Sequence, residues 1–405
     1  MLSSKRASSW RRPSVAMTSD IFASSFTVAV SWLLGMSSAL SSPSSRQAPL
    51  IAVDARLWGR SGIGRYCREL LPRVMAVWPE ARWRLYGKSD ELCILPEVEK
   101  LPWDLPVYSW REHFPGGEPA GWHEADLRWV PHYNVTAGSM APLVATVHDV
   151  LPLVEHAGWR GRLRSVVAGR YFQRVRRVAG RVLCPSRFSG EGLASIAHVT
   201  SDRIRVTPLA AAFLRPAVSD LPREPVWLFV GNVKPHKGLS TVLAALSRDE
   251  VAATGRRLVV VGRRDGFFTG SPELARASGR LGERVQWAGE VDDVTLGRWY
   301  ARAEALIMPS RHEGFGLPVL EAMTAGCPVV AARAGSLPEV AGEAALWFEP
   351  GDADELARRL VDLANDERLR TQLASSGRCR SAQFDWEITA RLTVSALREA
   401  LEGPR

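Results

Sequence analysis

The order of apolar segments after Pro49 is the feature that most limits what this chain can fold into. Short apolar runs alternate with longer segments whose apolar residues repeat at helical spacing. Strands separated in this way by amphipathic helices are the pattern of a parallel α/β sheet. In the first half the expected strands are Leu50–Val53, Trp83–Tyr86, Leu143–His148 and Arg181–Cys184. In the second half they are Trp227–Val230, Leu258–Val261, Val285–Trp287, Ala305–Met308, Pro328–Ala331 and Ala345–Phe348.

Two such series predict two doubly wound domains that face one cleft. A length of 405 residues suits two cores. Prolines bracket a polar segment at 215–225, which we interpret as a linker between a domain at 49–214 and one at 226–385. The expected helices are about Arg65–Val77, Ser240–Leu246, Val294–Ala303, Pro318–Ala325 and Ala353–Leu363. In open sheets of this kind, ligands bind outside the carboxyl ends of the strands.

Residues 1–48 differ from the rest of the chain. They are rich in serine, and Arg11 and Arg12 precede an apolar run from Ile21 to Leu40 that serines interrupt. Three interpretations remain: a signal peptide, a weak membrane anchor, or an extension upstream of the true start, which we rank first. No catalytic residue is expected there.

Composition excludes several classes of protein. The five cysteines are odd in number, widely spaced and never in a C-x-x-C pair, which argues against a disulfide framework or a zinc site and favours a reducing, cytoplasmic location. Histidines and carboxylates also lack metal-ligand spacing, so no metal and no cofactor is expected. The formal net charge of +9 favours an anionic partner. We do not expect that partner to be nucleic acid.

The most informative segment runs from Pro309 to Met323. It predicts a strand end, a glycine loop and the first turns of a helix. Gly314 and Gly316 permit close backbone approach to a ligand, and a helix N-terminus offers free N–H groups to an anion. Glu313 and Glu321 flank this loop, where carboxylates can accept hydrogen bonds from sugar or ribose hydroxyls.

The full string closely resembles the donor-site signature of glycosyltransferase family 4, also called group 1, whose members are retaining enzymes with the GT-B fold. That resemblance implies a nucleoside diphosphate sugar as donor and assigns Glu313 to the reaction centre. The donor contacts that it implies in this segment are Gly314, Phe315, Gly316, Leu317 and Glu321.

A second segment, Phe229–Gly238, looks like the strand and loop by which the family supplies cations to the donor diphosphate. Lys237 matches the family's lysine, but Asn232 stands where many members carry arginine. Lys234 is a candidate replacement, because a flexible ammonium can reach a phosphate as a point charge. An ordinary exposed loop lysine is the alternative for Lys234.

Two segments of the first half are also similar to the family. The Asp54–Tyr66 stretch resembles its first strand and glycine loop, with Gly62 and Gly64 facing the donor phosphates. Ala145–Pro152 resembles the segment that places a histidine at the reaction centre, here His148, with Asp149 as a candidate orienter.

The resemblance covers about residues 50 to 402 and leaves the Pro- and Trp-rich stretch at about 97–131 outside. It implies that 226–385 binds the donor, that 49–214 binds a glycan or lipid-pyrophosphate-linked acceptor, and that 386–405 is a helix returning to the first domain.

Within the family, the residues of these motifs look most like those of mannosyltransferases of polysaccharide assembly, with GDP-mannose favoured as donor. The alternatives are a nucleotide-sugar-binding protein without catalysis and a nicotinamide-dependent oxidoreductase, which the absent G-x-G-x-x-G fingerprint argues against.

One long basic segment stands apart from these motifs. Between Arg160 and Arg181 there is no acidic residue, and apolar residues form a helical stripe through the arginines. Such a helix can rest on an anionic bilayer at the inner face of the cell membrane, hold a lipid pyrophosphate, or simply present a solvated face.

Overall fold

The computed structural model describes residues 48–59, 61–88, 90–92, 95, 98–155, 158–211, 222–263 and 272–403. Most of the expected N-terminal extension, Cys93, and residues 215–221 of the expected linker lie outside them. The side chain of Arg160 also lies outside the described part of the chain. Within the described residues, no helix is both long and apolar enough to cross a bilayer.

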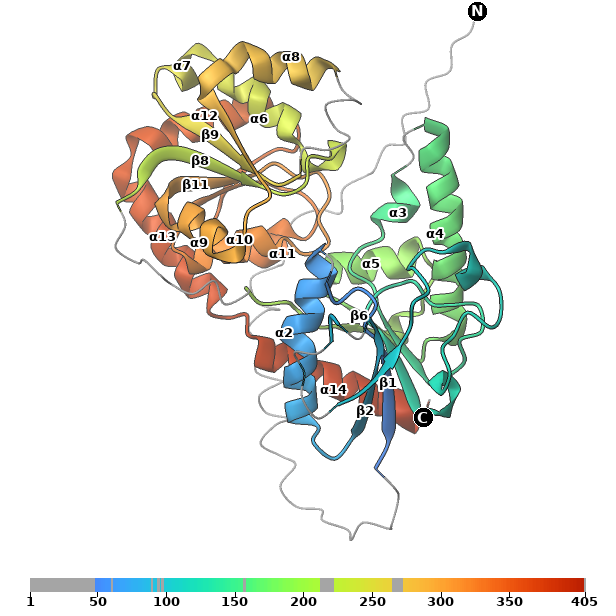
Figure 1. Ribbon diagram of the computed structural model, residues 1–405. Coiled ribbons are helices and arrows are strands. Elements are labelled where there is room, and N and C mark those ends of the chain that lie inside the picture. The colour runs from blue at the N-terminus through green and yellow to red at the C-terminus, as the bar shows by residue number, and fades with distance from the viewer. Residues whose placement is uncertain are drawn as a thin grey trace, which may run out of the picture. The chain divides into compact units, whose positions relative to one another are not determined.

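The first sheet has seven strands in the order β3-β2-β1-β4-β5-β6-β7, and every pair of neighbours is parallel. Its strands are β1 (Leu50–Asp54), β2 (Arg82–Gly87), β3 (Glu99–Pro102), β4 (Leu127–Val130), β5 (Leu143–Thr146), β6 (Arg181–Cys184) and β7 (Ile204–Val206). The chain leaves β1 toward one edge and returns beside it as β4 (Figure 1). The reversal of strand order therefore lies between β1 and β4.

Alternation of side chains along these strands builds two core layers. Ile51 and Val53 of β1 face one layer, while Leu50 and Ala52 face the other. The first layer is covered by α2 (Ser61–Val77) and by α14 (Trp386–Glu402), which packs against α2, β4, β5 and β6. The second is covered by α4 (Gly158–Val178) and α5 (Arg187–Ser195).

The second sheet has six parallel strands in the order β10-β9-β8-β11-β12-β13. Its strands are β8 (Glu224–Val230), β9 (Arg257–Val261), β10 (Val285–Gly289), β11 (Ala303–Met308), β12 (Val329–Ala332) and β13 (Leu346–Phe348). Here the strand order reverses between β8 and β11.

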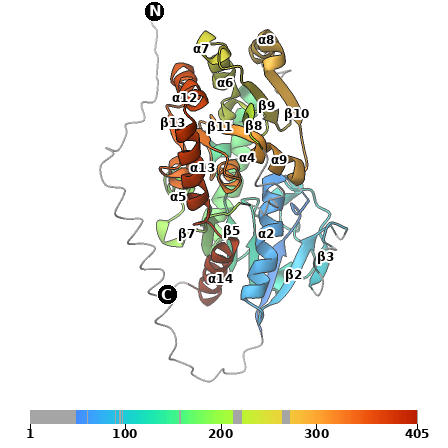
Figure 2. The same ribbon diagram turned by 90° about the vertical axis from the view of Figure 1, so that its left-hand side faces the viewer.

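Helices cover both faces of this sheet (Figures 1 and 2). One face carries α9 (Asp293–Arg302), α10 (Leu317–Thr324) and α11 (Leu337–Ala341). The other carries α6 (Leu239–Leu246), α7 (Asp249–Ala252), α8 (Pro272–Leu281) and α12 (Ala353–Asn365). Within the described residues the remaining α-helices are α3 (Leu151–Val154), next to α4, and α13 (Glu367–Ser381), next to α10.

The expectation of two doubly wound sheets is confirmed, and the expected strands all form with shifts of at most three residues at their ends. Two details differ. The glycine loop before α2 is shorter than expected, because α2 already begins at Ser61 and includes Gly62 and Gly64. The stretch at about 97–131, which has little periodicity, contributes β3 and the fully buried β4.

Candidate active site

Two loops meet where the strand order of the second sheet reverses. One follows β8 and runs from Gly231 to Gly238, and the other follows β11 and runs from Pro309 to Gly316. The backbone N–H of Arg311 donates to the carbonyl of His236 across them (2.8 Å). Because ligands of doubly wound sheets bind at this position, the loops are the natural place for a ligand.

A lysine and a glutamate join these two loops. Nζ of Lys237 donates to Oε1 of Glu313 (2.5 Å), and the hydroxyl of Ser310 donates to the same oxygen (2.8 Å). The side chains of Lys237 and Glu313 retain 21% and 11% of their exposure. The pair is therefore held in place but is open to a ligand.

The N-terminus of α10 lies directly after these loops. Its N-cap is Gly316, whose φ of 96° is left-handed backbone that favours glycine. Leu317 is the first helical residue, and no side chain caps the helix. Pro318 has no N–H, and the N–H of Val319 donates to the carbonyl of Gly316 (2.9 Å), which leaves the N–H groups of Gly316 and Leu317 without a partner among the described residues. Phe315 is buried and packs edge-on against Phe384 (ring centroids 5.9 Å apart). The turn thus presents backbone donors to an anion while Phe315 fixes the loop to the core.

Glu321 lies further along α10 and is almost fully buried. Oε1 accepts a hydrogen bond from Nη1 of Arg65 on α2 (2.7 Å), and Oε2 accepts one from the hydroxyl of Tyr300 (2.9 Å). Burial raises the pKa of Glu321, and the positive charge of Arg65 opposes that rise. Arg65 also forms an ion pair with Asp293 at the start of α9. Arg65 thus connects the first sheet's α2 with two helices of the second sheet.

His148 follows β5 of the first sheet. Its Nε2 lies 3.1 Å from the carbonyl of Pro131, and its ring meets Tyr66 edge-on (centroids 4.9 Å apart). Burial lowers the pKa of His148, which favours the neutral imidazole. The partner that orients the ring is the Pro131 carbonyl, whereas the carboxylate of Asp149 accepts from the backbone N–H of Leu151.

The glycine loop after β11 also touches the loop after β5. A methyl group built on Gly314 would lie 2.1 Å from the carbonyl oxygen of His148. The carbonyl of Gly314 accepts hydrogen bonds from the hydroxyls of Ser186 (2.6 Å) and Ser189 (3.0 Å), and Ser189 also reaches the carbonyl of His148 (3.0 Å). His148 and the glycine loop therefore belong to one cluster.

The other predicted residues lie outside that cluster. Asn232 is exposed, and its side chain accepts from the backbone N–H of Arg263 (3.2 Å). Lys234 is exposed and forms no ion pair within the part of the chain that the structure describes. Gly62 is exposed in the first turn of α2, and Gly64 packs where a methyl group would lie 2.4 Å from the carbonyl of Trp58.

Sequence reasoning did not assign roles to Arg65, Tyr300 or Ser310. Arg65 directly follows Gly64, but its partner Glu321 is 256 residues away, so no local spacing could have revealed the pair. Ser310 is closer to prediction, because a hydroxyl three residues before Glu313 can reach its carboxylate in a tight loop.

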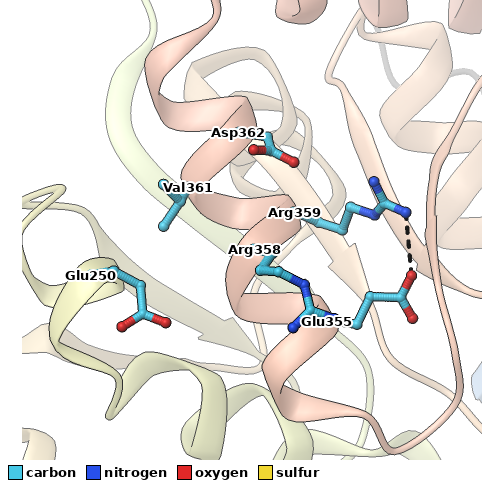
Figure 3. Close-up of a pocket in the computed structure, with 6 residues that line it drawn as sticks. All are labelled: Glu250, Glu355, Arg358, Arg359, Val361 and Asp362. Carbon is cyan, nitrogen blue, oxygen red and sulfur yellow. Dashed lines mark hydrogen bonds and ion pairs between the residues drawn. The ribbon is translucent and has the colours of Figure 1, made fainter.

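Among the described residues no cluster of three or more His, Cys, Asp or Glu side chains is placed to hold a metal ion. Figure 3 shows a shallow groove between α7 and α12 in which Arg359 donates to Glu355 (3.2 Å). Its lining residues are Glu250, Glu355, Arg358, Arg359, Val361 and Asp362. None of them belongs to the loops after β8 and β11.

Comparison with protein families gives a match over residues 224–366 to the model described as "Glycosyl transferases group 1". Among curated proteins, the chain is 31% identical over 233 residues to the O-antigen chain mannosyltransferase B of Escherichia coli. It is 30% identical over 281 residues to the MMP alpha-(1->4)-mannosyltransferase of Mycolicibacterium hassiacum. These matches cover 53% and 64% of this chain but only 59% and 66% of those two relatives.

Solved structures match over more of the chain at lower identity. The sucrose-phosphate synthase of Thermosynechococcus elongatus superposes with a TM-score of 0.65 at 20% identity, over 87% of this chain and 98% of that one. Anabaena HepE, solved in complex with UDP-glucose, gives 0.63 at 20%, over 86% and 99%. WaaG, a glycosyltransferase involved in lipopolysaccharide biosynthesis, gives 0.64 at 19%, over 86% and 99%.

Proposed function

Because residues 224–366 are a glycosyl transferase group 1 domain and the chain has the GT-B fold, we propose that it is a nucleotide-sugar-dependent glycosyltransferase. In this proposal a sugar, with mannose favoured, moves from a nucleoside diphosphate to a glycan or lipid-linked acceptor with retention of configuration. The two mannosyltransferase relatives support the choice of mannose and, with it, of GDP-mannose as donor. The observation that carries the proposal is the Lys237–Glu313 pair beside the free N-terminus of α10.

In this proposal the donor diphosphate occupies the space beside the loops after β8 and β11. Lys237 and the first turn of α10 supply positive charge to the departing diphosphate, and no metal ion is needed for that role. A phosphate oxygen that replaces Glu313 as partner of the ammonium frees that carboxylate for the transferred sugar. The Lys237–Glu313 pair is therefore a preformed receptor for both halves of the donor.

Glu321 is assigned to the donor ribose. Its carboxylate already accepts from Arg65 and Tyr300. An ionised carboxylate has about four acceptor positions, so ribose hydroxyls can join these partners rather than replace them. Arg65 and Tyr300 hold the carboxylate in place, which makes them positioning residues in this proposal.

His148 is assigned to the reaction centre on the acceptor side. As a neutral imidazole held by the Pro131 carbonyl, it can exchange hydrogen bonds with sugar hydroxyls without bringing a positive charge next to the developing oxocarbenium ion. The contact between Gly314 and the His148 carbonyl places it beside the donor loop.

The direct test is a screen of nucleotide sugars for thermal stabilisation, followed by assay of diphosphate release with and without glycan acceptors. A ligand at 100 times its dissociation constant adds about 2.7 kcal/mol to the free energy of unfolding. Stabilisation without diphosphate release would instead support the catalytically inactive binding protein. Stabilisation by a nicotinamide dinucleotide alone would support the oxidoreductase.

Replacement of Lys237 and Lys234 is expected to separate their roles. Lys237→Ala removes a charge-assisted contact to the diphosphate and should cost about 1.5–3 kcal/mol in the transition state, measured as kcat/KM. Lys234→Ala serves as a matched lysine control in the same loop. A comparable loss there would mean that Lys234 stands in for the family's arginine, whereas unchanged kcat/KM in both variants would contradict this diphosphate site.

We further propose that the N-terminal half of α4 rests on an anionic membrane. Leu163 and Val166, one helical turn apart, are both 57% exposed, although Tyr171 and Val175 of the same stripe are buried. The arginines around them are Arg162, Arg164 and Arg170. All three are exposed, and none forms a hydrogen bond or ion pair within the described residues. Exposed apolar side chains framed by cations match the interface of an anionic bilayer.

Sedimentation with lipid vesicles tests this surface. The protein is expected to sediment with phosphatidylglycerol vesicles in low salt, and not with phosphatidylcholine vesicles, because the attraction is electrostatic and screened by salt. Leu163→Ser with Val166→Ser should release it. Val294→Ser, a change at an equally exposed position on α9, should not. Equal binding by all variants would rule out α4 as the membrane contact.

A further inference from the structure

The part of the Trp-rich stretch that runs from Tyr108 to Phe114 carries three exposed aromatic side chains. Tyr108 is 48% exposed, Trp110 71% and Phe114 57%, and the last two rings meet edge-on with centroids 5.7 Å apart. Large aromatic side chains usually lie inside a protein. Trp110 and Phe114 form an exposed patch that the core does not explain. Tyr108 borders it and also packs against the rings of Tyr133 and Tyr171.

This segment is held rigidly by a buried carboxylate. Glu112 has no exposed surface, and it accepts from the hydroxyl of Tyr171 (2.6 Å) and from the backbone N–H of Tyr108 (2.8 Å). It also pairs with Arg56 (2.8 Å), which in turn pairs with Asp54 at the end of β1 (2.7 Å). Such a fully partnered buried network fixes the backbone on which the exposed rings stand.

Tyr108 has an unusual backbone conformation. Its φ is 67°, in the left-handed region that a bulky side chain rarely adopts. Strain of this kind persists where the surroundings impose it. The Tyr108 hydroxyl lies 3.2 Å from Nε2 of His132, whose ring is 6.2 Å from that of His148. The exposed segment is thus linked to the residue assigned to the reaction centre.

The position of the Tyr108–Phe114 segment in the fold suits binding of the acceptor rather than of the donor. Asp54 ends β1 and His132 follows β4, so the segment is anchored where the strand order of the first sheet reverses. The donor residues proposed above follow β8 and β11 of the other sheet. A second ligand, bound beside His148 from the first sheet, would therefore meet the aromatic segment first.

We propose that Tyr108, Trp110 and Phe114 form a saccharide-binding platform and that the acceptor presents a pyranose ring to it. The apolar C–H face of a pyranose stacks on an aromatic ring, and its hydroxyls need donors and acceptors at the edge of that ring. The polar groups of this segment are the Tyr108 hydroxyl, 3.2 Å from Nε2 of His132, and the side chain of Arg111, which is exposed. This inference rests on the proposed function and selects the glycan, rather than the lipid phosphate, as the recognised part of the acceptor.

Saturation-transfer NMR on the full chain tests the platform. The probes are the methyl glycosides of mannose, glucose, galactose and N-acetylglucosamine. At least one glycoside is expected to receive saturation from the wild-type protein, and Trp110→Ala with Phe114→Ala should weaken its binding by about tenfold or more. Ile388→Ala, a change at an exposed apolar position on α14, is the matched control and should leave glycoside binding unchanged.

Thermal stabilisation by the nucleotide sugar, measured on the same samples, separates the two hypotheses. Its absence from wild-type protein would refute the proposed function, whereas its presence in the platform variant shows that the variant is folded. Given that result, an unaltered glycoside signal in the platform variant, or no signal with any glycoside, would overturn the platform. A variant that instead converts a dimer to a monomer would show that the aromatic patch is a contact between copies of the chain.

Discussion

Replacing Glu313 with glutamine is expected to lower turnover by about 10²–10³-fold and to leave donor binding nearly unchanged. The reason is that Glu313 is held by Lys237 and Ser310 before the donor arrives. Once the donor diphosphate takes over the ammonium of Lys237, the carboxylate, still held by Ser310, stabilises the positive charge that develops on the transferred sugar as its bond to phosphate breaks. Glutamine keeps the shape and loses the charge, so the loss falls on kcat, measured with saturating acceptor.

Glu321→Gln is the matched comparison, because it makes the same chemical change in the same motif. Its proposed ligand, the donor ribose, does not change during the reaction. Uniform binding of that kind alters KM for the donor and leaves kcat nearly untouched. If Glu313→Gln changed only the donor KM, or if Glu321→Gln lowered only kcat, the two roles would have been assigned the wrong way round.

The fold was largely predictable because its strands are buried on both faces. A strand such as β9, with the sequence Arg-Leu-Val-Val-Val, is recognisable without any partner. By contrast, β4 contains Arg128, whose guanidinium is satisfied by the carbonyls of Trp122 and His123. Trp122 and His123 lie outside the strand, so the sequence of β4 alone gave no sign that a strand with a buried arginine is central to the sheet.

The candidate site was predictable where its residues share one loop and unpredictable where they meet across the chain. Gly314 and Gly316 stand beside Glu313 in the sequence, so their closeness needs no fold. The pairing of Arg65 with Glu321 depends on how α2 lies against α10, which no local pattern encodes. Lys234 was a candidate because it carries a charge two residues after Asn232, and only the fold reveals that its side chain is exposed while that of Lys237 reaches Glu313.

The glycine loop after β11 packs closely against the loop after β5 that carries His148. A methyl group on Gly314 would lie 2.1 Å from the carbonyl oxygen of His148 and 3.0 Å from Cβ of Asp149. The first of these atoms is backbone, which cannot move aside without displacing the loop. The hydroxyls of Ser186 and Ser189, which hold the Gly314 carbonyl, would be displaced with it.

Gly314→Ala is therefore expected to lower kcat by about 10²-fold, because a shift of ~1 Å in a reacting group costs about that much. Thermal stabilisation by nucleoside diphosphate alone should persist, since the atoms that the methyl group would meet belong to His148 and Asp149 and not to Lys237. Gly279→Ala on α8, where a methyl group meets nothing within 4 Å, is the matched control and should keep full activity. If Gly314→Ala were as active as Gly279→Ala, the loops would not need their close contact for catalysis, and His148 would lose its proposed place beside the donor.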